Sequence, residues 1–255
     1  MDSFELESRH IRARRRITVW LPPGFRRRRS AYPVLYLNDG QNLFEPSRAF
    51  AGVTWNAGDA AARLIRRRAI PPIIIVGIDH GEGRRAQEYL PIRDDHYPGQ
   101  FRPMAAEYAA FVTRELMPQI AQMYPLAKGA ANTGLGGSSY GAIAALFTSL
   151  TYPGVFGRLL LESPSLYVGN GYMLRRARAA KRWPTRVYLG VGTAETSRPH
   201  VNLETVENVL KLRHILRAAG LGPRRLEVRL DEGASHSEAA WAERFPDAVE
   251  FLFRA

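Results

Sequence analysis

The chain alternates between short apolar runs and longer segments in which apolar residues recur every three or four positions. Ile73 to Val76 are four consecutive β-branched residues, a pattern typical of a strand buried on both faces. Residues 104–124 carry apolar side chains at helical spacing, which predicts an amphipathic helix. Further strands are predicted within residues 4–8, 15–25, 32–40, 132–135, 158–164, 186–195 and 225–236. Further helices are predicted at 59–68, from Ala142 onward, at 203–220 and at 237–253, the last bent or interrupted by Pro246.

This order of elements predicts an α/β fold. Strands that alternate with helices specify a mostly parallel sheet with helices on both faces. The first two strands have no helix between them, which predicts an antiparallel N-terminal edge. In such sheets, reactive side chains gather at the carboxyl ends of the strands.

Length and composition indicate a single domain spanning residues 1–255. A chain of 255 residues, 45% of them hydrophobic, is long enough for one sizeable core. There is no cysteine, which excludes disulfides, thiolate metal sites and a thiol nucleophile. We see no apolar leader and no run of membrane-spanning length, and therefore expect a soluble, cytoplasmic protein that does not bind membranes.

The charge is strongly basic, with a formal net charge of +12. Nearly all basic residues are arginines, dispersed in short runs at 14–16, 26–29, 66–68, 175–176 and 224–225. Such dispersion favours a solvated surface over a nucleic-acid-binding stripe, and no nucleic-acid-binding motif is present. The sequence therefore predicts no nucleic-acid partner, although a positive potential could steer acidic substrates.

Ser139 is the candidate nucleophile. It lies at the centre of Gly137-Ser138-Ser139-Tyr140-Gly141, between a predicted strand and a predicted helix. A hydroxyl raised on such a strained turn leaves no room for side chains two positions away, and the helix that follows supplies free N–H groups. The alternative is a glycine-rich helix start whose serines only cap backbone groups.

A serine nucleophile needs a base and an orienting carboxylate. His236 lies directly after the last predicted strand, and His80, after the strand at 73–79, is its competitor. Glu195 follows the strand before that of the histidine, which gives the chain order Ser139, Glu195, His236 expected of α/β-hydrolases. Asp231 and Glu232 are the alternative acids.

An oxyanion hole requires two preorganised N–H donors. The backbone amide of Tyr140, directly after the nucleophile, is the first candidate. We expect the second from Gln41, with Gly40 forming the turn that brings this backbone close. The alternative for Asn38-Asp39-Gly40-Gln41 is an ordinary turn.

The chain resembles the "Putative esterase" family of α/β-hydrolases, which is related to enterochelin esterases, feruloyl esterases and S-formylglutathione hydrolases. The resemblance covers nearly the whole chain, in the segments YLNDGQNLF, VGID, EYLP, NTGLGGSSYGAIAAL, YPGVFGRLLLESPS, VGTAE and GASHSEAAW. It implies an α/β-hydrolase fold and a serine ester hydrolase with Ser139 as nucleophile and His236 as base. It supports Glu195 as the acid less firmly, because relatives vary between Asp and Glu there. Two positions depart from the family pattern, Tyr140 and Ala142, and neither removes a catalytic group.

The sequence therefore predicts a serine carboxylesterase that forms an acyl-enzyme on Ser139 and acts on a small-molecule, sugar or siderophore ester. No cofactor is implied, and the histidines lack metal-ligand spacing. An acyltransferase on the same scaffold and a non-catalytic binding protein remain alternatives. Residues 78–101 are predicted to be an irregular segment over the site, whose Arg84, Arg85 and Arg93 either meet an acidic substrate group or brace the loop.

Overall fold

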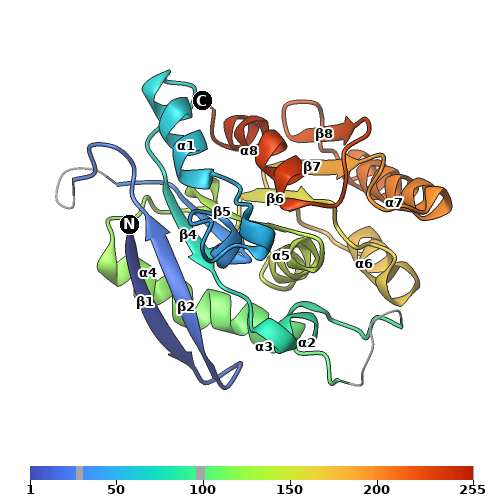
Figure 1. Cartoon of the computed structure of the whole chain (residues 1–255), viewed down its shortest axis with the longest axis horizontal. Helices are drawn as coiled ribbons and strands as arrows, with labels where there is room; N and C mark the ends of the chain where they lie inside the picture. The colour runs from blue at the N-terminus through green and yellow to red at the C-terminus, as the bar shows by residue number, and fades with distance from the viewer. Residues whose placement is uncertain (27–30, 96–100, 255) are drawn as a thin grey trace.

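The computed structural model describes residues 1–26, 31–95 and 101–254. In these residues, eight strands form one sheet in the order β1-β2-β4-β3-β5-β6-β7-β8 (Figure 1). The strands are β1 (Asp2–Ser8), β2 (Ala13–Trp20), β3 (Val34–Asn38), β4 (Ile74–Ile78), β5 (Thr133–Ser138), β6 (Arg158–Glu162), β7 (Arg186–Gly192) and β8 (Leu226–Asp231). The predicted α/β class is confirmed.

The sheet is parallel from β4 to β8 and antiparallel at its N-terminal edge. β1 pairs antiparallel with β2, and β2 pairs antiparallel with β4, while the pairings from β4 through β3, β5, β6 and β7 to β8 are parallel. Every residue of β4 is buried, as its run of β-branched residues predicts. The carboxyl ends of the parallel strands therefore share one edge, where the site residues gather.

Helices cover both faces of the sheet (Figure 1). Successive side chains of a strand point to opposite faces, and β3 sends Leu35 and Leu37 to one apolar cluster and Val34 and Tyr36 to the other. Helices α1 (Ala57–Arg66) and α8 (Glu238–Phe253) pack on the first face. The second face carries α2 (Arg85–Tyr89), α3 (Ala105–Ala110), α4 (Met117–Met123), α5 (Tyr140–Thr151), α6 (Val168–Arg178) and α7 (Pro199–Ala218). Each fully buried leucine or isoleucine of these clusters contributes about 1.5–3 kcal/mol.

The predicted helix at 104–124 is interrupted by a π-helical segment. α3 runs into π-helical η4 (Phe111–Leu116), and α4 follows directly. The N–H of Met117 donates to the carbonyl of Val112, five residues earlier. Pro118 follows, and its ring would clash with the carbonyl four residues earlier in a regular helix. The wider π turn accommodates the proline ring. Because this turn depends on Pro118 and not on the spacing of apolar residues, apolar spacing alone did not predict the π turn.

Other helix boundaries also differ from those predicted. α5 begins at Tyr140, directly after Ser139, and α7 begins at Pro199, which occupies its first turn. α8 runs through Pro246 without interruption, because Phe245, Ala248 and Val249 on both sides of the proline are anchored in the core. Helix α6 was not predicted from the sequence, and its first turn contains left-handed residues at 169–171.

The segment at 78–101 is not wholly irregular. Residues 82–89 form the 3-10 helix η3 (Glu82–Arg84) and then α2, and residues 96–100, with His96, lie outside the described residues. The remaining 3-10 helices are η1 (Gly40–Asn42), η2 (Phe50–Gly52) and η5 (Ala130–Asn132). Two side chains of the segment, Arg85 and Asp94, contact residues of the candidate site described below.

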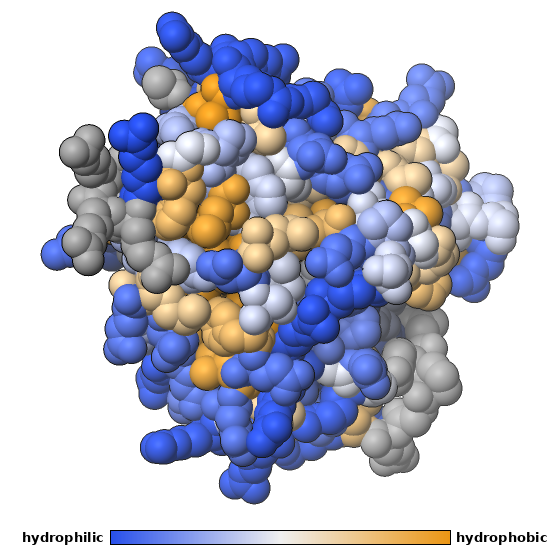
Figure 2. Space-filling model, turned by 60° about the vertical axis from the view of Figure 1, so that its left-hand side comes forward, coloured by the Kyte–Doolittle hydropathy of each residue, from blue (hydrophilic) through white to orange (hydrophobic). Residues whose placement is uncertain are grey.

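Most arginines of the dispersed runs are exposed. Arg14, Arg16 and the run 66–68 face solvent, whereas Arg15 is buried in an ion pair with Glu88 at 2.6 Å. The face shown in Figure 2 is hydrophilic around its rim and carries apolar residues across its middle. The run 26–29 lies outside the described residues except for its first member. This distribution matches the predicted solvated surface. Among the described residues, no helix combines the length and hydropathy needed to cross a membrane.

Candidate active site

Ser139 occupies a strained turn between β5 and α5. Its backbone has φ 56° and ψ −125°, a conformation that costs an L-residue about 1–3 kcal/mol. The predicted need for glycine on both sides is confirmed by the packing. A Cβ on Gly137 would lie 2.9 Å from the carbonyl carbon of Gly141, and one on Gly141 would lie 2.7 Å from a carboxylate oxygen of Asp39. The turn thus brings its two glycines together and carries Ser139 at its tip.

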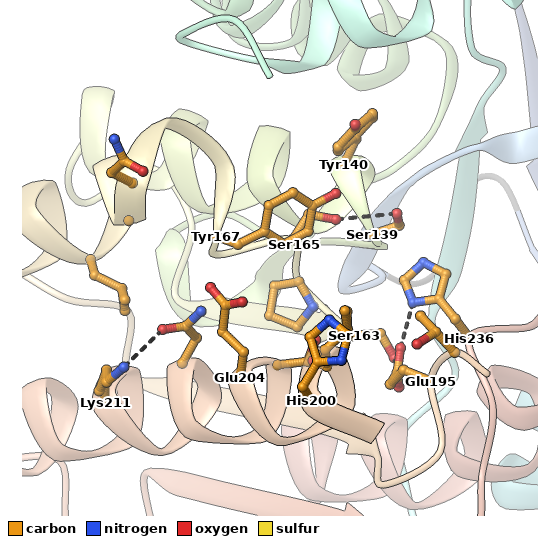
Figure 3. Close-up of a pocket in the computed structure, with 18 of the residues that line it drawn as sticks. Ser139, Tyr140, Ser163, Ser165, Tyr167, Glu195, His200, Glu204, Lys211 and His236 are labelled. Atoms are coloured by element: carbon orange, nitrogen blue, oxygen red, sulfur yellow. Dashed lines mark hydrogen bonds and ion pairs between the residues drawn. The ribbon is translucent and has the colours of Figure 1, made fainter. Parts of the chain in front are cut away.

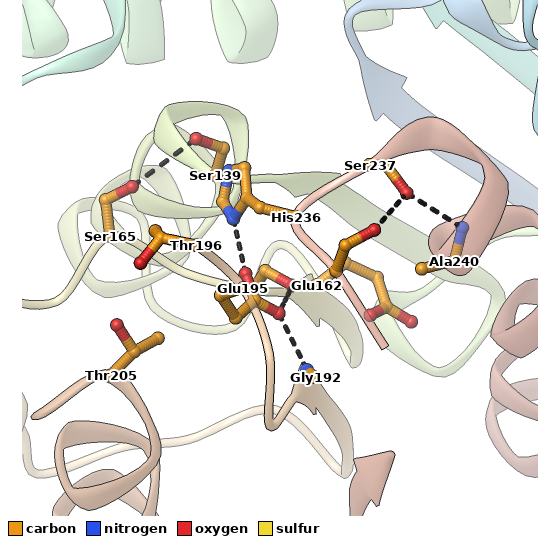
Figure 4. Close-up of polar contacts among 12 residues, drawn as sticks. Ser139, Glu162, Ser165, Gly192, Glu195, Thr196, Thr205, His236, Ser237 and Ala240 are labelled. Carbon is orange, nitrogen blue, oxygen red and sulfur yellow. Dashed lines mark hydrogen bonds and ion pairs between the residues drawn. The ribbon is translucent and has the colours of Figure 1, made fainter. Parts of the chain in front are cut away.

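His236 contacts the carboxylate of Glu195. Nδ1 of His236 meets Oε2 of Glu195, while Oε1 accepts 2.7 Å hydrogen bonds from the Ser163 hydroxyl and the Gly192 N–H (Figure 4). Burial of this carboxylate raises its pKa, but the hydrogen bonds and the charge of His236 outweigh burial, so the pKa of Glu195 is lowered overall. Glu195 is therefore held ionised, with one oxygen reserved for the histidine.

The alternative acids lie elsewhere. Asp231 accepts a 3.0 Å hydrogen bond from the buried Arg244, which also bonds Glu162 at 2.9 Å. Glu232 is exposed. Arg244 therefore ties the ends of β6 and β8 together across β7, and Asp231 is part of this brace.

The imidazole of His236 lies between Ser139 and Glu195. Figures 3 and 4 show this arrangement from two directions. The hydroxyl of Ser139 lies 3.4 Å from that of Ser165, and Ser139 and His236 line the same two cavities. The side chain of His236 is 33% exposed and that of Glu195 2% exposed, so the histidine is reachable from solvent and the carboxylate is not.

His80 also lies near the site. It lines the smaller of the two cavities together with Ser139 and His236. Its Nδ1 accepts a 2.8 Å hydrogen bond from the Glu82 N–H, and burial lowers its pKa. Nδ1 of His236 has a carboxylate partner, whereas that of His80 is occupied by a backbone donor. The structure therefore favours His236 as the histidine that a carboxylate orients.

The two expected oxyanion donors belong to adjacent structural elements. Tyr140 is the first residue of α5, where backbone N–H groups have no partner within the helix. Gln41 lies in η1, directly after β3, and a Cβ on Gly40 would come within 2.5 Å of the Gly77 backbone. The side-chain oxygen of Gln41 accepts a 3.3 Å hydrogen bond from the His80 N–H. Gln41 itself lines neither cavity, although Asp39 and Asn42 on both sides of it line the smaller one.

Two cavities meet at Ser139 and differ in chemistry. The larger, of about 990 Å³, extends between α6 and α7 and is lined largely by polar and basic side chains (Figure 3). The smaller, of about 370 Å³, has Phe50, Ala51, Val53 and Trp241 among its lining residues. Phe50 is 76% exposed and forms part of its rim. A substrate whose reacting carbonyl lies at Ser139 can therefore extend into a polar and into a more apolar space.

The structure also brings further side chains to the site. Arg85 forms a bidentate ion pair with Asp39 at 2.7 and 2.8 Å, which is the bracing role weighed for this arginine. Tyr140, the departure from the family pattern, donates a 2.5 Å hydrogen bond to buried Asp94. Ser163 follows β6, so its position at a strand's carboxyl end is a signal that could have identified it. No cluster of three or more His, Cys, Asp or Glu side chains suited to a metal ion occurs among the described residues.

Burial also raises the pKa of Glu238, a carboxyl group lining the smaller cavity, to about 7. Glu238 accepts hydrogen bonds from the Asn42 amide at 2.8 Å and the Trp55 indole at 2.5 Å. Because the ordinary value is 4.5, the folded chain binds more protons than the unfolded chain between pH 4.5 and about 7. The free energy of unfolding should therefore fall as pH rises through this window.

We expect Glu238→Gln to remove this dependence. Melting temperatures of the wild type and the variant, measured by circular dichroism from pH 5 to pH 8, should differ increasingly in favour of the variant as pH rises. An offset independent of pH would contradict the raised pKa.

A family model described as "Putative esterase" matches residues 8–252. The chain belongs to this esterase family. Protein YbbA of Bacillus subtilis is 23% identical over 251 residues, which cover 96% of this chain and 95% of the relative. The iron(III) enterobactin esterase of Dickeya dadantii is 27% identical over 71% of this chain, and the match spans only 41% of that longer protein.

The solved structures confirm the α/β-hydrolase fold of this esterase-family chain. The siderophore hydrolase EstB of Aspergillus nidulans superposes with a TM-score of 0.78 at 18% identity, covering 99% of this chain and 94% of that one. Family membership supports ester hydrolysis as the activity, and so agrees with the prediction from the sequence.

Proposed function

We propose that the chain is a serine carboxylesterase that forms an acyl-enzyme on Ser139. The observation that carries the proposal is the imidazole of His236, which lies between the Ser139 turn and a buried carboxylate. This arrangement, at the carboxyl ends of β5, β7 and β8, supports Ser139 as nucleophile, His236 as base and Glu195 as the orienting acid.

Glu195 sets the protonation of His236. Because Glu195 is ionised and accepts from Nδ1, the ring proton belongs on Nδ1, and the lone pair of Nε2 is free for the Ser139 proton. As Ser139 attacks the ester carbonyl, His236 takes this proton and then gives it to the leaving alcohol. Water activated by the same imidazole then attacks the acyl-enzyme and releases the acid.

The tetrahedral oxyanion is proposed to bind the backbone N–H groups of Tyr140 and Gln41. The first stands at the positive N-terminus of α5, whose twelve residues add a favourable dipole. The second is supported by the close approach of the Gly40 and Gly77 backbones, which fixes η1 beside β4. Each such donor is typically worth about 3 kcal/mol of transition-state stabilisation.

The substrate is proposed to be an ester with one bulky polar part. The larger cavity, which is lined mostly by polar and charged residues, has a volume of about 990 Å³, the size of a drug-sized ligand site. Relatives named as enterobactin esterase and siderophore hydrolase make siderophore esters the first class to try. Sugar acetates and feruloyl esters are further candidates, because both also place a polar ring beside the ester.

A hydrolysis screen tests the proposal. We expect the purified chain to cleave p-nitrophenyl acetate and butyrate, and to cleave at least one bulky polar ester faster, with chromatography identifying the acid and alcohol released. Product analysis with added alcohol separates hydrolysis from acyl transfer. An absence of cleavage across p-nitrophenyl esters, enterobactin, sugar acetates, feruloyl esters and thioesters would contradict the proposal.

A further inference from the structure

We infer that Ser163 and Trp241 form a hydrogen-bond chain that positions Glu195. This inference rests on the proposed function, because it assigns the chain a role in catalysis through the proposed acid. The indole N–H of Trp241 lies 2.9 Å from the Ser163 hydroxyl, which lies 2.7 Å from Oε1 of Glu195. Ser163 is 1% exposed and Trp241 4% exposed, so water does not compete for these bonds.

The direction of the chain follows from the donors available. An indole can only donate, so Ser163 must accept the hydrogen bond from Trp241. A serine hydroxyl has one proton, which is therefore available for Oε1 of Glu195. With the Gly192 N–H on the same oxygen, Oε1 is fully engaged and only Oε2 faces His236. The carboxylate cannot rotate without breaking two hydrogen bonds.

Trp241 also contacts the histidine that this carboxylate orients. The rings of His236 and Trp241 pack edge to face, with centroids 5.0 Å apart and an interplanar angle of 83°. Trp241 lies in the first turns of α8, directly after the loop that carries His236. One residue therefore supports both members of the Glu195–His236 pair, the imidazole by ring packing and the carboxylate through Ser163.

The backbone at Ser163 is strained, and the hydroxyl held there is the one that contacts Glu195. Ser163 has φ 42°, a left-handed conformation in which a residue other than glycine is disfavoured by about 1 kcal/mol or more. Its N–H donates to the Gly190 carbonyl at 2.8 Å, which fixes the strand end beside β7. A glycine would adopt this conformation without strain but would lack the hydroxyl. Ser163 is thus a positioning residue that acts through Glu195.

Variants at position 163 separate the hydroxyl from the backbone. Ser163→Ala removes the hydroxyl and keeps the strain, whereas Ser163→Gly removes both. We expect both variants to lower kcat/KM about 10- to 100-fold, the loss typical when a group that orients a functional histidine through a hydrogen bond is removed. The acid limb of the pH profile should move upward by about 0.5 to 1 pH unit, because a carboxylate with fewer donors holds the His236 proton more tightly.

Trp241→Phe tests the other end of the chain. It keeps an aromatic ring against His236 and removes the indole donor. The loss in kcat/KM and the upward shift of the acid limb should therefore both appear, with a smaller magnitude than in the Ser163 variants. The double variant with Ser163→Gly should be no worse than Ser163→Gly alone, because Trp241 acts through Ser163. Trp183→Phe is the matched control: Trp183 lines neither cavity and its indole N–H has no hydrogen-bond partner among the described residues, so the variant should keep the wild-type pH profile.

Two results would overturn the inference. One is wild-type kcat/KM and an unmoved acid limb in Ser163→Ala and Ser163→Gly, in a protein whose Ser139→Ala variant is inactive. The other is independent of turnover and concerns the proton NMR signal of His236 Nδ1–H, which should shift in both Ser163 variants and stay in place in Trp183→Phe. An unshifted signal overturns the inference whatever the activity, whereas hydrolysis that survives Ser139→Ala overturns only the proposed function.

Discussion

Replacing Ser139 with alanine should lower kcat/KM for ester hydrolysis by a factor on the order of 10⁴ to 10⁶. The proposed mechanism passes through a covalent bond to this hydroxyl, and no other group can take its place at the tip of the β5–α5 turn. The smaller side chain removes one oxygen from a half-buried position, so the fold should persist. Initial rates with p-nitrophenyl butyrate, and mass spectrometry of the acyl adduct trapped on the wild type, measure the effect.

Ser138→Ala is the matched control for this experiment. Ser138 is the neighbouring serine, buried at the end of β5 and outside both cavities that meet at Ser139. Its replacement should leave the rate within a few-fold of the wild type. Equal activity of the Ser139 and Ser138 variants would show that the turn is structural only.

The second large effect is expected for Glu195→Gln, which should lower kcat about 10⁴-fold. The glutamine carbonyl would accept from Ser163 and Gly192, leaving its NH₂ group toward His236. Nδ1 would then have to accept, which moves the ring proton to Nε2, where it blocks transfer from Ser139. Steady-state kinetics at neutral pH would show a loss in kcat with little change in KM.

Glu232→Gln is the control for the acid, because this exposed carboxylate was one of the two alternatives, with Asp231. Glu232→Gln should keep the wild-type kcat. A loss of kcat in Glu232→Gln, together with full activity in Glu195→Gln, would make Glu232 rather than Glu195 the acid that orients His236. The lowered pKa of Glu195 adds a stability readout. The contribution of ionised Glu195 to the free energy of unfolding is fully present above its ordinary pKa of 4.5 and is lost as pH falls through the lower folded-state pKa. The wild type should therefore lose more stability in acid than Glu195→Gln.

The sheet was predictable from the sequence because its central strands, such as β3 and β4, are buried on both faces. Runs such as Ile73 to Val76 can only be buried, and the alternation with helices then fixes a parallel arrangement. Helix boundaries were less predictable. The π turn at 111–116 depends on how Pro118 is accommodated, and the start of α6 depends on left-handed residues at 169–171, neither of which affects apolar periodicity.

The candidate triad was predictable because its members follow strands that share one edge. Ser139, Glu195 and His236 come directly after β5, β7 and β8, so sequence position alone brings them near one another. Ser163 also follows a strand, but the partners of the supporting residues are not indicated by sequence position. Ser163 and Trp241 are 78 positions apart, and Asp39 and Arg85 are 46 positions apart, so their pairing follows only from the folded arrangement.

The turn that carries Ser139 has a consequence for how such a chain evolves. Its backbone geometry is one that glycine would adopt freely, so the residue proposed to make the chain reactive is also one that weakens it. Selection for heat resistance alone would favour loss of this side chain and would leave an inert protein of the same shape. Persistence of serine at position 139 in descendants of this chain would therefore record selection for turnover, maintained against a standing thermodynamic pressure.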